Sequence, residues 1–114
     1  MKQPASPPEP RVFAALGDPT RLLILERLRA VDDLSISELT EGTDLTRQAV
    51  TKHLEVLAEA GLVTDLRSGR ERRWACRPEP LAQVAAWADD YRRQWERRFD
   101  RLDAWLNSQV PPKP

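Results

Sequence analysis

The stretch from Thr46 to Arg77 constrains the fold of this chain more than any other part of the sequence. Its first part, TRQAVTKHLEVLAEAGLV, places apolar residues three and four positions apart, which is the periodicity of an amphipathic helix. Its second part, TDLRSGRERRWACR, has two alternating runs on either side of Ser68-Gly69, which is the pattern of a β-hairpin. The sequence therefore predicts a helix over residues 46–60 and a two-stranded hairpin over residues 62–77.

A helix followed by a basic hairpin is the layout of a recognition helix and its wing, which small proteins use to enter the grooves of DNA. The apolar side of the predicted helix leaves a polar face at its amino-terminal end. In helix-turn-helix proteins this end enters the major groove, where arginine and glutamine side chains can pair with guanine or adenine. We therefore expect base contacts from Arg47, Gln48, Thr51 and Lys52. A solvated helix face would carry the same residue types.

The residues before this helix supply the rest of a helix-turn-helix unit. An amphipathic segment over residues 36–40 and a loop over residues 42–44 lead to Thr46, whose hydroxyl is placed to cap the next helix. Two further helices are predicted upstream. The first is marked by Val12 and Leu16, and the second begins after Asp18 as its N-cap.

Basic residues are concentrated in the predicted hairpin, although the whole chain has 18 lysines and arginines against 18 acidic residues. Residues 67–77 carry five arginines and a single glutamate. A neutral protein binds a polyanion when its cations cluster on one surface, because each phosphate contact releases counterions. We expect Arg70 at the turn and Arg73 in the second strand to contact phosphates of double-stranded DNA. A hairpin that is only a solubilised sheet edge is the alternative.

The carboxy-terminal segment predicts one long helix with an apolar stripe. From Leu81 onwards, apolar and aromatic residues recur at spacings of three and four. About 26 residues at 1.5 Å each span roughly 39 Å, which is more than a domain of this size needs to cover itself. We therefore expect a second copy of the chain to pack on this helix in a two-fold dimer. The residues predicted at the dimer interface are Val12, Phe13, Leu16, Trp87, Tyr91, Trp95, Phe99 and Leu102. The alternative is that these side chains close the core of one chain.

Three runs in this order, LGDPTRLLILERL, ISELTEGTDLTRQAVTKHLEVLAEAGLV and RSGRERRWACR, closely resemble the ArsR-type (arsenical-repressor-like) transcriptional regulators. The resemblance extends from Val12 to about Leu106. It implies a mainly α (α+β) fold, a winged helix-turn-helix with a two-stranded β-wing and a long C-terminal dimerisation helix. It also implies a homodimeric repressor, and it adds His53 to the DNA-reading positions.

The sequence departs from the metal-sensing members of that family. Those members carry a cysteine pair before the recognition helix, or Asp and His ligands on the last helix, because such ions need several thiolate, imidazole or carboxylate donors. Here the corresponding segment, ISELTEG, has no cysteine, and His53 is the single histidine of the chain. We expect a metal-independent member with no metal site and no cofactor. The sequence leaves the effector ligand unknown.

Length and composition complete the expectations. We expect residues 11–108 to form one domain, with disordered tails at residues 1–10 and 109–114. The absence of a signal peptide and of a membrane-spanning stretch, with one cysteine, predicts a cytoplasmic protein that contacts no membrane. An enzyme would need a nucleophile with its base, a pair of carboxylates in a cleft or a phosphate loop. The sequence shows none of these patterns, so we do not expect an enzyme. The alternative function is a winged-helix module whose aromatic C-terminal helix binds another protein.

Overall fold

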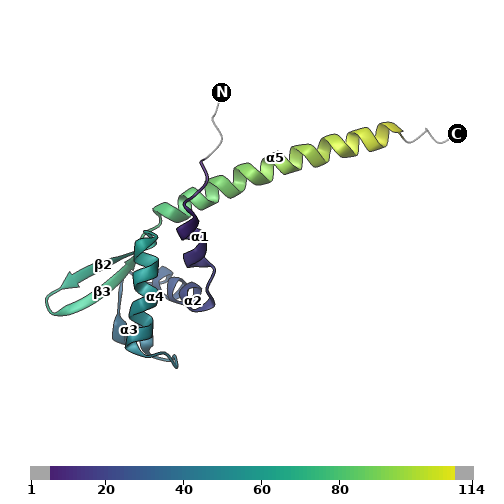
Figure 1. Ribbon diagram of the computed structural model, residues 1–114. Coiled ribbons are helices and arrows are strands. Elements are labelled where there is room, and N and C mark those ends of the chain that lie inside the picture. Colours follow the sequence, from purple (N-terminus) through teal and green to yellow (C-terminus); the bar gives the residue numbers. More distant parts are fainter. Residues whose placement is uncertain (1–5, 110–114) are drawn as a thin grey trace.

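The computed structural model describes residues 6–109, which form five helices and a three-stranded sheet. The helices are α1 (Pro10–Leu16), α2 (Pro19–Arg29), α3 (Ile36–Thr40), α4 (Arg47–Glu59) and α5 (Glu79–Gln109). The strands are β1 (Leu34–Ser35), β2 (Val63–Ser68) and β3 (Glu71–Cys76). Helices α1 to α4 form the body, while the β2–β3 hairpin projects from one side and α5 from the other (Figure 1). The predicted winged helix-turn-helix is confirmed.

Residues 1–5 and 110–114 of the two predicted tails lie outside the described residues. The described part of the first tail leads directly into α1. Pro8 is buried, and Pro10 already begins α1. At the other end α5 continues to Gln109.

Local side-chain hydrogen bonds fix where the helices begin. The Asp18 carboxylate accepts a hydrogen bond of 3.0 Å from the backbone N–H of Arg21 at the start of α2. Thr46 caps α4 in the same way, because its hydroxyl oxygen accepts from the N–H of Ala49 at 3.1 Å. Both N-caps agree with the sequence prediction. Helix α4 ends just before Gly61, whose φ of 77° lies in the left-handed region that glycine adopts without strain.

The core lies between α2, α4 and the inner face of the sheet. Val50, Leu54 and Leu57 of α4 are buried, as the apolar periodicity predicts. They pack in one cluster with buried residues of the other elements, which include Ile24, Leu25, Leu28, Leu39, Leu62 and Trp74. The core therefore holds one side of α4 and leaves the other side free.

A third strand joins the predicted two-stranded wing. The strand order is β1-β3-β2, and all neighbours are antiparallel. Leu34 pairs with Trp74 and Ser35 with Arg73, so β1 connects the hairpin directly to the start of α3. Strand β1 is not predictable from the sequence, because two residues are too few to show the alternation of a strand.

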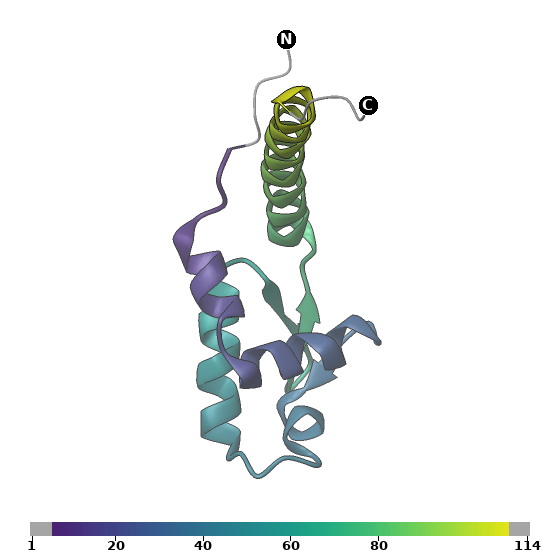
Figure 2. The ribbon, with the colours of Figure 1, turned by 90° about the vertical axis from the view of Figure 1, so that its right-hand side faces the viewer.

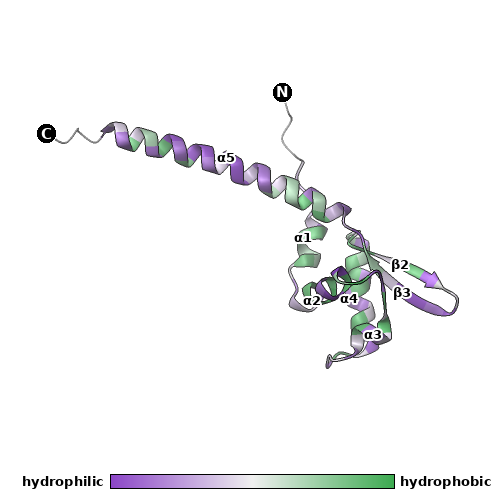
Figure 3. Cartoon of the chain, turned by 180° about the vertical axis from the view of Figure 1, so that it is seen from behind, coloured by the Kyte–Doolittle hydropathy of each residue, from purple (hydrophilic) through white to green (hydrophobic). Residues whose placement is uncertain are grey.

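Helix α5 makes the molecule elongated. A compact domain of this length has a radius of gyration of about 13 Å, whereas the Cα radius of gyration is 21.3 Å. Its 31 residues include none that is buried, and at 1.5 Å per residue they span roughly 46 Å. The helix leaves the body as a single rod (Figure 2) and carries hydrophobic and hydrophilic residues along its whole length (Figure 3). Among residues 6–109, no helix has the length and hydrophobicity needed to cross a bilayer.

Candidate nucleic-acid interface

The amino-terminal half of α4 presents a continuous polar face. Arg47, Gln48 and Lys52 are exposed, and Thr51 is half-buried. These four residues occupy adjacent positions on the helix surface, because residues three and four apart lie on one face. The Thr51 hydroxyl donates to the Arg47 carbonyl oxygen at 2.8 Å, so this side chain lies along the helix. The structure thus brings together the four residues that the sequence predicts as base contacts.

His53 lies apart from that face and contacts the body of its own chain. Its Nδ1 is 3.4 Å from Nη1 of Arg21 and 3.9 Å from a carboxylate oxygen of Asp18, and its side chain is 24% exposed. The Arg21 guanidinium also donates to the carbonyl oxygens of Ala15 and Ala14, at 2.8 and 3.2 Å. Arg21 therefore connects the end of α1 to α4. This arrangement disfavours the predicted DNA contact by His53, since the ring would have to leave these partners.

The hydrogen bond from the Arg21 backbone N–H holds the pKa of Asp18 below its ordinary value. The unfolded chain then binds more protons than the folded chain between the two pKa values, so stability rises with pH there. The contribution of Asp18 is complete above the ordinary aspartate pKa and is lost as the pH falls through the lowered pKa. We expect Asp18→Asn, which preserves the cap without the titration, to make the free energy of unfolding depend less on pH in the acidic range. Urea unfolding of both proteins over an acidic pH series measures this. The same pH dependence in the variant and the wild type would contradict the expectation.

Most arginines of the hairpin are held by carboxylates. Arg73 pairs with Asp33, with Glu38 at 2.9 Å and with Glu71 at 3.3 Å. Its hydrogen bond to Asp33 is the main cause that raises the pKa of Arg73. Its side chain is 24% exposed. These contacts tie β3 to the β1–α3 segment and disfavour the predicted phosphate contact by Arg73.

Two further arginines of the hairpin are also paired within the chain. Arg72 forms an ion pair of 2.8 Å with Asp65 and lies over the ring of Trp74, 4.7 Å from its centroid. Arg77 lies 3.7 Å from Glu79. The five cations counted in the sequence therefore do not act as one positive surface.

The remaining cations lie near the tip of the hairpin. Arg67 and Arg70 are exposed, and neither forms an ion pair within the part of the chain that the structure describes. Gly69, with a φ of 64°, makes the turn that presents Arg70. The hairpin extends from the body beside α4 (Figure 1). Among the described residues, the tip therefore carries the unpaired positive charge of the hairpin.

The residues predicted at a dimer interface divide into two groups. Val12 is 4% exposed and belongs to the core of its own chain, and Leu16 packs partly against that core. Val12 therefore has little surface left for a partner, whereas Leu16 is half-buried and lines an open groove. The aromatic residues of the set form a row of contacts that begins between α1 and α5 and continues along α5, named here the aromatic ladder. Its members are Phe13, Trp87, Tyr91, Trp95 and Phe99, with successive ring centroids 5.5, 5.6, 6.3 and 5.9 Å apart.

The outer part of the aromatic ladder is open to solvent. Tyr91 is 53%, Trp95 40% and Phe99 58% exposed, and Leu102 continues the same stripe at 49%. Large exposed apolar surfaces of this kind mark interaction sites in proteins. The prediction that α5 has a partner gains support from this exposure.

A metal site has little basis in the described residues. Over residues 6–109, no three His, Cys, Asp or Glu side chains are grouped so that they could hold an ion. Burial raises the pKa of the Cys76 thiol, which lowers its reactivity as a thiolate. Membership of a metal-independent subgroup stays a prediction.

Comparisons with known proteins agree with this geometry. Residues 16–65 match the family described as "Helix-turn-helix domain". The HTH-type transcriptional regulator YuzN of Bacillus subtilis, described as uncharacterized, is 46% identical over 79 residues, which cover 64% of this chain and 86% of YuzN. The HTH-type transcriptional regulator Rv2034 of Mycobacterium tuberculosis is 40% identical, with 87% and 89% covered. The solved structure of an ArsR-like transcriptional regulator from Rhodococcus sp. RHA1 superposes with a TM-score of 0.79 at 35% identity, with 88% and 91% covered.

Proposed function

Since this chain belongs to the ArsR family of helix-turn-helix transcriptional regulators, we propose that it is a homodimeric repressor of its own operon. Proteins of this family bind DNA and are not enzymes. We propose that each protomer places the amino-terminal half of α4 in the major groove of a pseudo-palindromic operator. The observation that carries the proposal is the exposed face of Arg47, Gln48 and Lys52 on α4, and the exposed Arg67 and Arg70 near the tip of the hairpin support it.

The homodimer is supported by α5, since the outer members of the aromatic ladder have no cover in one chain. Two-fold symmetry would present two copies of α4 to two half-sites, whose centres lie about 34 to 36 Å apart or a multiple of that. Binding there would occlude polymerase and repress the operon. A chain that uses α5 to bind a different protein, without contacting DNA, is the alternative function.

Titration of a fragment of its own promoter, at several salt concentrations, separates the two functions. The proposed repressor binds the fragment with an affinity that falls as salt rises. If Arg47→Ala, Gln48→Ala and Arg70→Ala each leave that affinity unchanged, DNA recognition by this surface is refuted.

We expect Arg47→Ala and Gln48→Ala each to weaken operator binding by roughly 1 to 3 kcal/mol, because each substitution removes a side chain that pairs with a base edge. Binding to random DNA should change much less, because base-edge contacts carry the sequence preference. Fluorescence anisotropy on operator and random DNA measures the two affinities, and Arg11→Ala, at an exposed arginine of α1 paired with Glu9 at 3.2 Å, serves as the control. Equal reductions in affinity for operator and random DNA would contradict a role of Arg47 in specificity.

Arg70 and Arg73 offer a matched pair within one hairpin. Arg70→Ala in a dimer removes two phosphate contacts, so the slope of log affinity against log salt should become shallower by about 2, at 0.9 per phosphate. Arg73→Ala should leave the slope unchanged and lower the midpoint of urea unfolding, because it leaves three carboxylates without their partner. An unchanged slope for Arg70→Ala would show that the wing tip does not contact the phosphates of the DNA.

A further inference from the structure

The guanidinium of Arg21 lies at the junction of three helices. The residue belongs to α2, and its side chain is half-buried. Its Nε and Nη2 donate to the carbonyl oxygens of Ala15 and Ala14 of α1, while its Nη1 lies 3.4 Å from Nδ1 of His53 on α4. The planar guanidinium therefore makes three contacts at once, two with α1 and one with α4.

The end of α1 is a fixed support for this arginine. The last carbonyl groups of a helix lack partners within the helix, and a positive charge is favourable at that end. Helix α1 is held by the core through Val12 and Ala15, which are 4% and 0% exposed. Its Phe13 ring also packs edge-on against Trp87 of α5, with 5.5 Å between the centroids. Arg21 therefore bonds to a part of the molecule that is itself anchored.

His53 is the polar anchor of α4. Within residues 6–109, the side-chain hydrogen bonds and ion pairs that join α4 to other elements all involve its ring, which lies 3.4 Å from Arg21 and 3.9 Å from Asp18. The guanidinium has only donors, so Nδ1 accepts and the ring proton lies on Nε2. The core holds α4 through buried apolar residues such as Leu54 and Leu57. Because apolar burial is not directional, the contact at His53 adds a directional restraint on the rotation of α4 about its axis.

This restraint acts next to the face that is proposed to read the bases. His53 lies between Lys52 of the polar face and Leu54 of the buried face. A rotation of α4 by about 10° moves a group on the helix surface, roughly 6 Å from the axis, by about 1 Å. Hydrogen bonds to base edges need donor–acceptor distances of about 2.7 to 3.2 Å, so this shift is enough to break them. Attraction to phosphates changes much less over such a distance.

We propose that Arg21 is a positioning residue for sequence recognition, because its contacts with α1 and His53 fix the rotation of α4 that aligns Arg47 and Gln48 with the base edges. Arg21 touches no base in this mechanism and acts through His53. The inference rests on the proposed function and names a residue outside the reading face on which specificity depends. Its measure is the specificity ratio, defined here as the affinity for operator divided by the affinity for random DNA.

Arg21→Lys tests the proposal. Lysine keeps the positive charge but lacks the planar fork that holds α1 and His53 together. We expect the specificity ratio, measured by fluorescence anisotropy, to fall about fivefold or more, which is the smallest loss typical of one base contact. The affinity for random DNA should change much less. An arginine that contacted a phosphate directly could be replaced by lysine with an unchanged ratio, and that result would overturn the proposal.

The specificity ratio separates positioning from a simple loss of stability. Only folded protein binds DNA, so partial unfolding lowers both affinities by the same factor and leaves their ratio unchanged. Leu28→Val is the matched control, because it removes a buried methylene from α2 and leaves the contacts of Arg21 intact. It should lower the midpoint of urea unfolding and preserve the ratio. The same fall of the ratio in both variants would overturn the proposal.

Variants of His53 test the route by which Arg21 acts. His53→Ala removes the acceptor and should lower the specificity ratio as Arg21→Lys does. His53→Asn, whose side-chain oxygen can take the place of Nδ1, should retain more of it. The double variant of Arg21→Lys and His53→Ala should have the ratio of His53→Ala alone, because both changes remove one contact. Reductions that multiply in the double variant would show that the two residues act separately, and would overturn the proposal.

The outcomes distinguish this inference from the proposed function. A wild-type protein with equal affinity for operator and random DNA would refute sequence-specific recognition itself. A wild-type preference that falls in Arg47→Ala but persists in Arg21→Lys would refute the role of Arg21 alone.

Discussion

Trp95→Glu is expected to convert the protein into a folded monomer. Trp95 lies in the middle of the exposed stripe, with ring centroids 6.3 Å from Tyr91 and 5.9 Å from Phe99. Loss of a central interface tryptophan weakens binding by about 2 kcal/mol or more. Each dimer loses two tryptophan side chains, one from each chain, so its dissociation constant should rise by roughly a thousandfold. Two carboxylates facing each other across the two-fold axis add repulsion.

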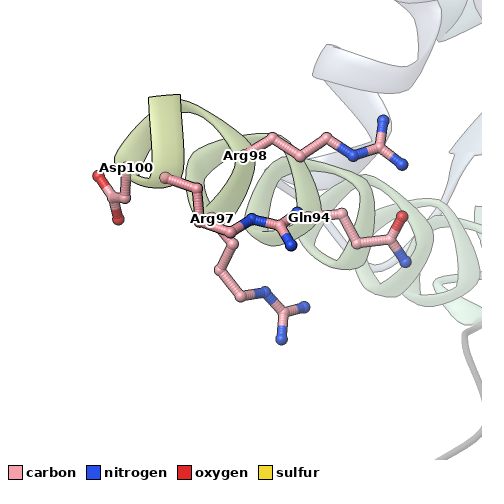
Figure 4. A pocket seen from close by; sticks show the side chains of 5 residues that line it. Gln94, Arg97, Arg98 and Asp100 are labelled. Atoms are coloured by element: carbon pink, nitrogen blue, oxygen red, sulfur yellow. The ribbon is translucent and has the colours of Figure 1, made fainter. Parts of the chain in front are cut away.

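Analytical ultracentrifugation over a range of protein concentrations measures this change, and titration of operator DNA should show a parallel loss of affinity. Gln94→Glu is the matched control, because it adds the same charge at the next residue, which lines a hollow on the outer half of α5 (Figure 4). A Trp95→Glu protein that remains dimeric would place the interface elsewhere.

Trp74→Ala is expected to have the largest effect on stability. Trp74 is 1% exposed, belongs to the core cluster and pairs with Leu34 of β1. Removing a buried aromatic side chain lowers the free energy of unfolding by about 3 to 5 kcal/mol, a large part of the roughly 5 to 15 kcal/mol typical of a domain. The wing would lose its attachment to the body at the same time.

Urea unfolding at one fixed protein concentration measures this effect, because dimer formation makes the midpoint depend on concentration. Trp74→Phe is the control. It retains an aromatic ring and removes the indole Nε1, which has no hydrogen-bond partner among the described residues, so we expect the free energy of unfolding to fall less than in Trp74→Ala. Unfolding of Trp74→Ala at the wild-type midpoint would show that the ring contributes little.

The helices were predictable because each carries its own signal. The three-and-four spacing of Val50, Leu54 and Leu57 gave the orientation of α4, and Asp18 and Thr46 marked helix starts through hydrogen bonds to residues three positions away. Exposed residues at the start of α4 followed from that orientation. Such signals lie within a few residues of one another.

The partners of individual charges were not predictable in this way. Arg73 is 40 residues from Asp33, and Arg21 is 32 residues from His53. Nothing in the local pattern distinguishes these arginines from Arg70, which remains unpaired within the described residues. The count of five arginines therefore overestimated the positive charge that the hairpin presents. Folding neutralises most of it within the chain.

Because α5 has no buried residue, the protein concentration determines how much of the proposed dimer forms. In the proposed dimer the apolar side of this helix is covered only when two chains meet, so at low abundance the paired fraction grows steeply with the number of chains present. Operator occupancy then has a threshold set by the dimer dissociation constant. A protein that limits its own synthesis in this way would hold its concentration close to that threshold.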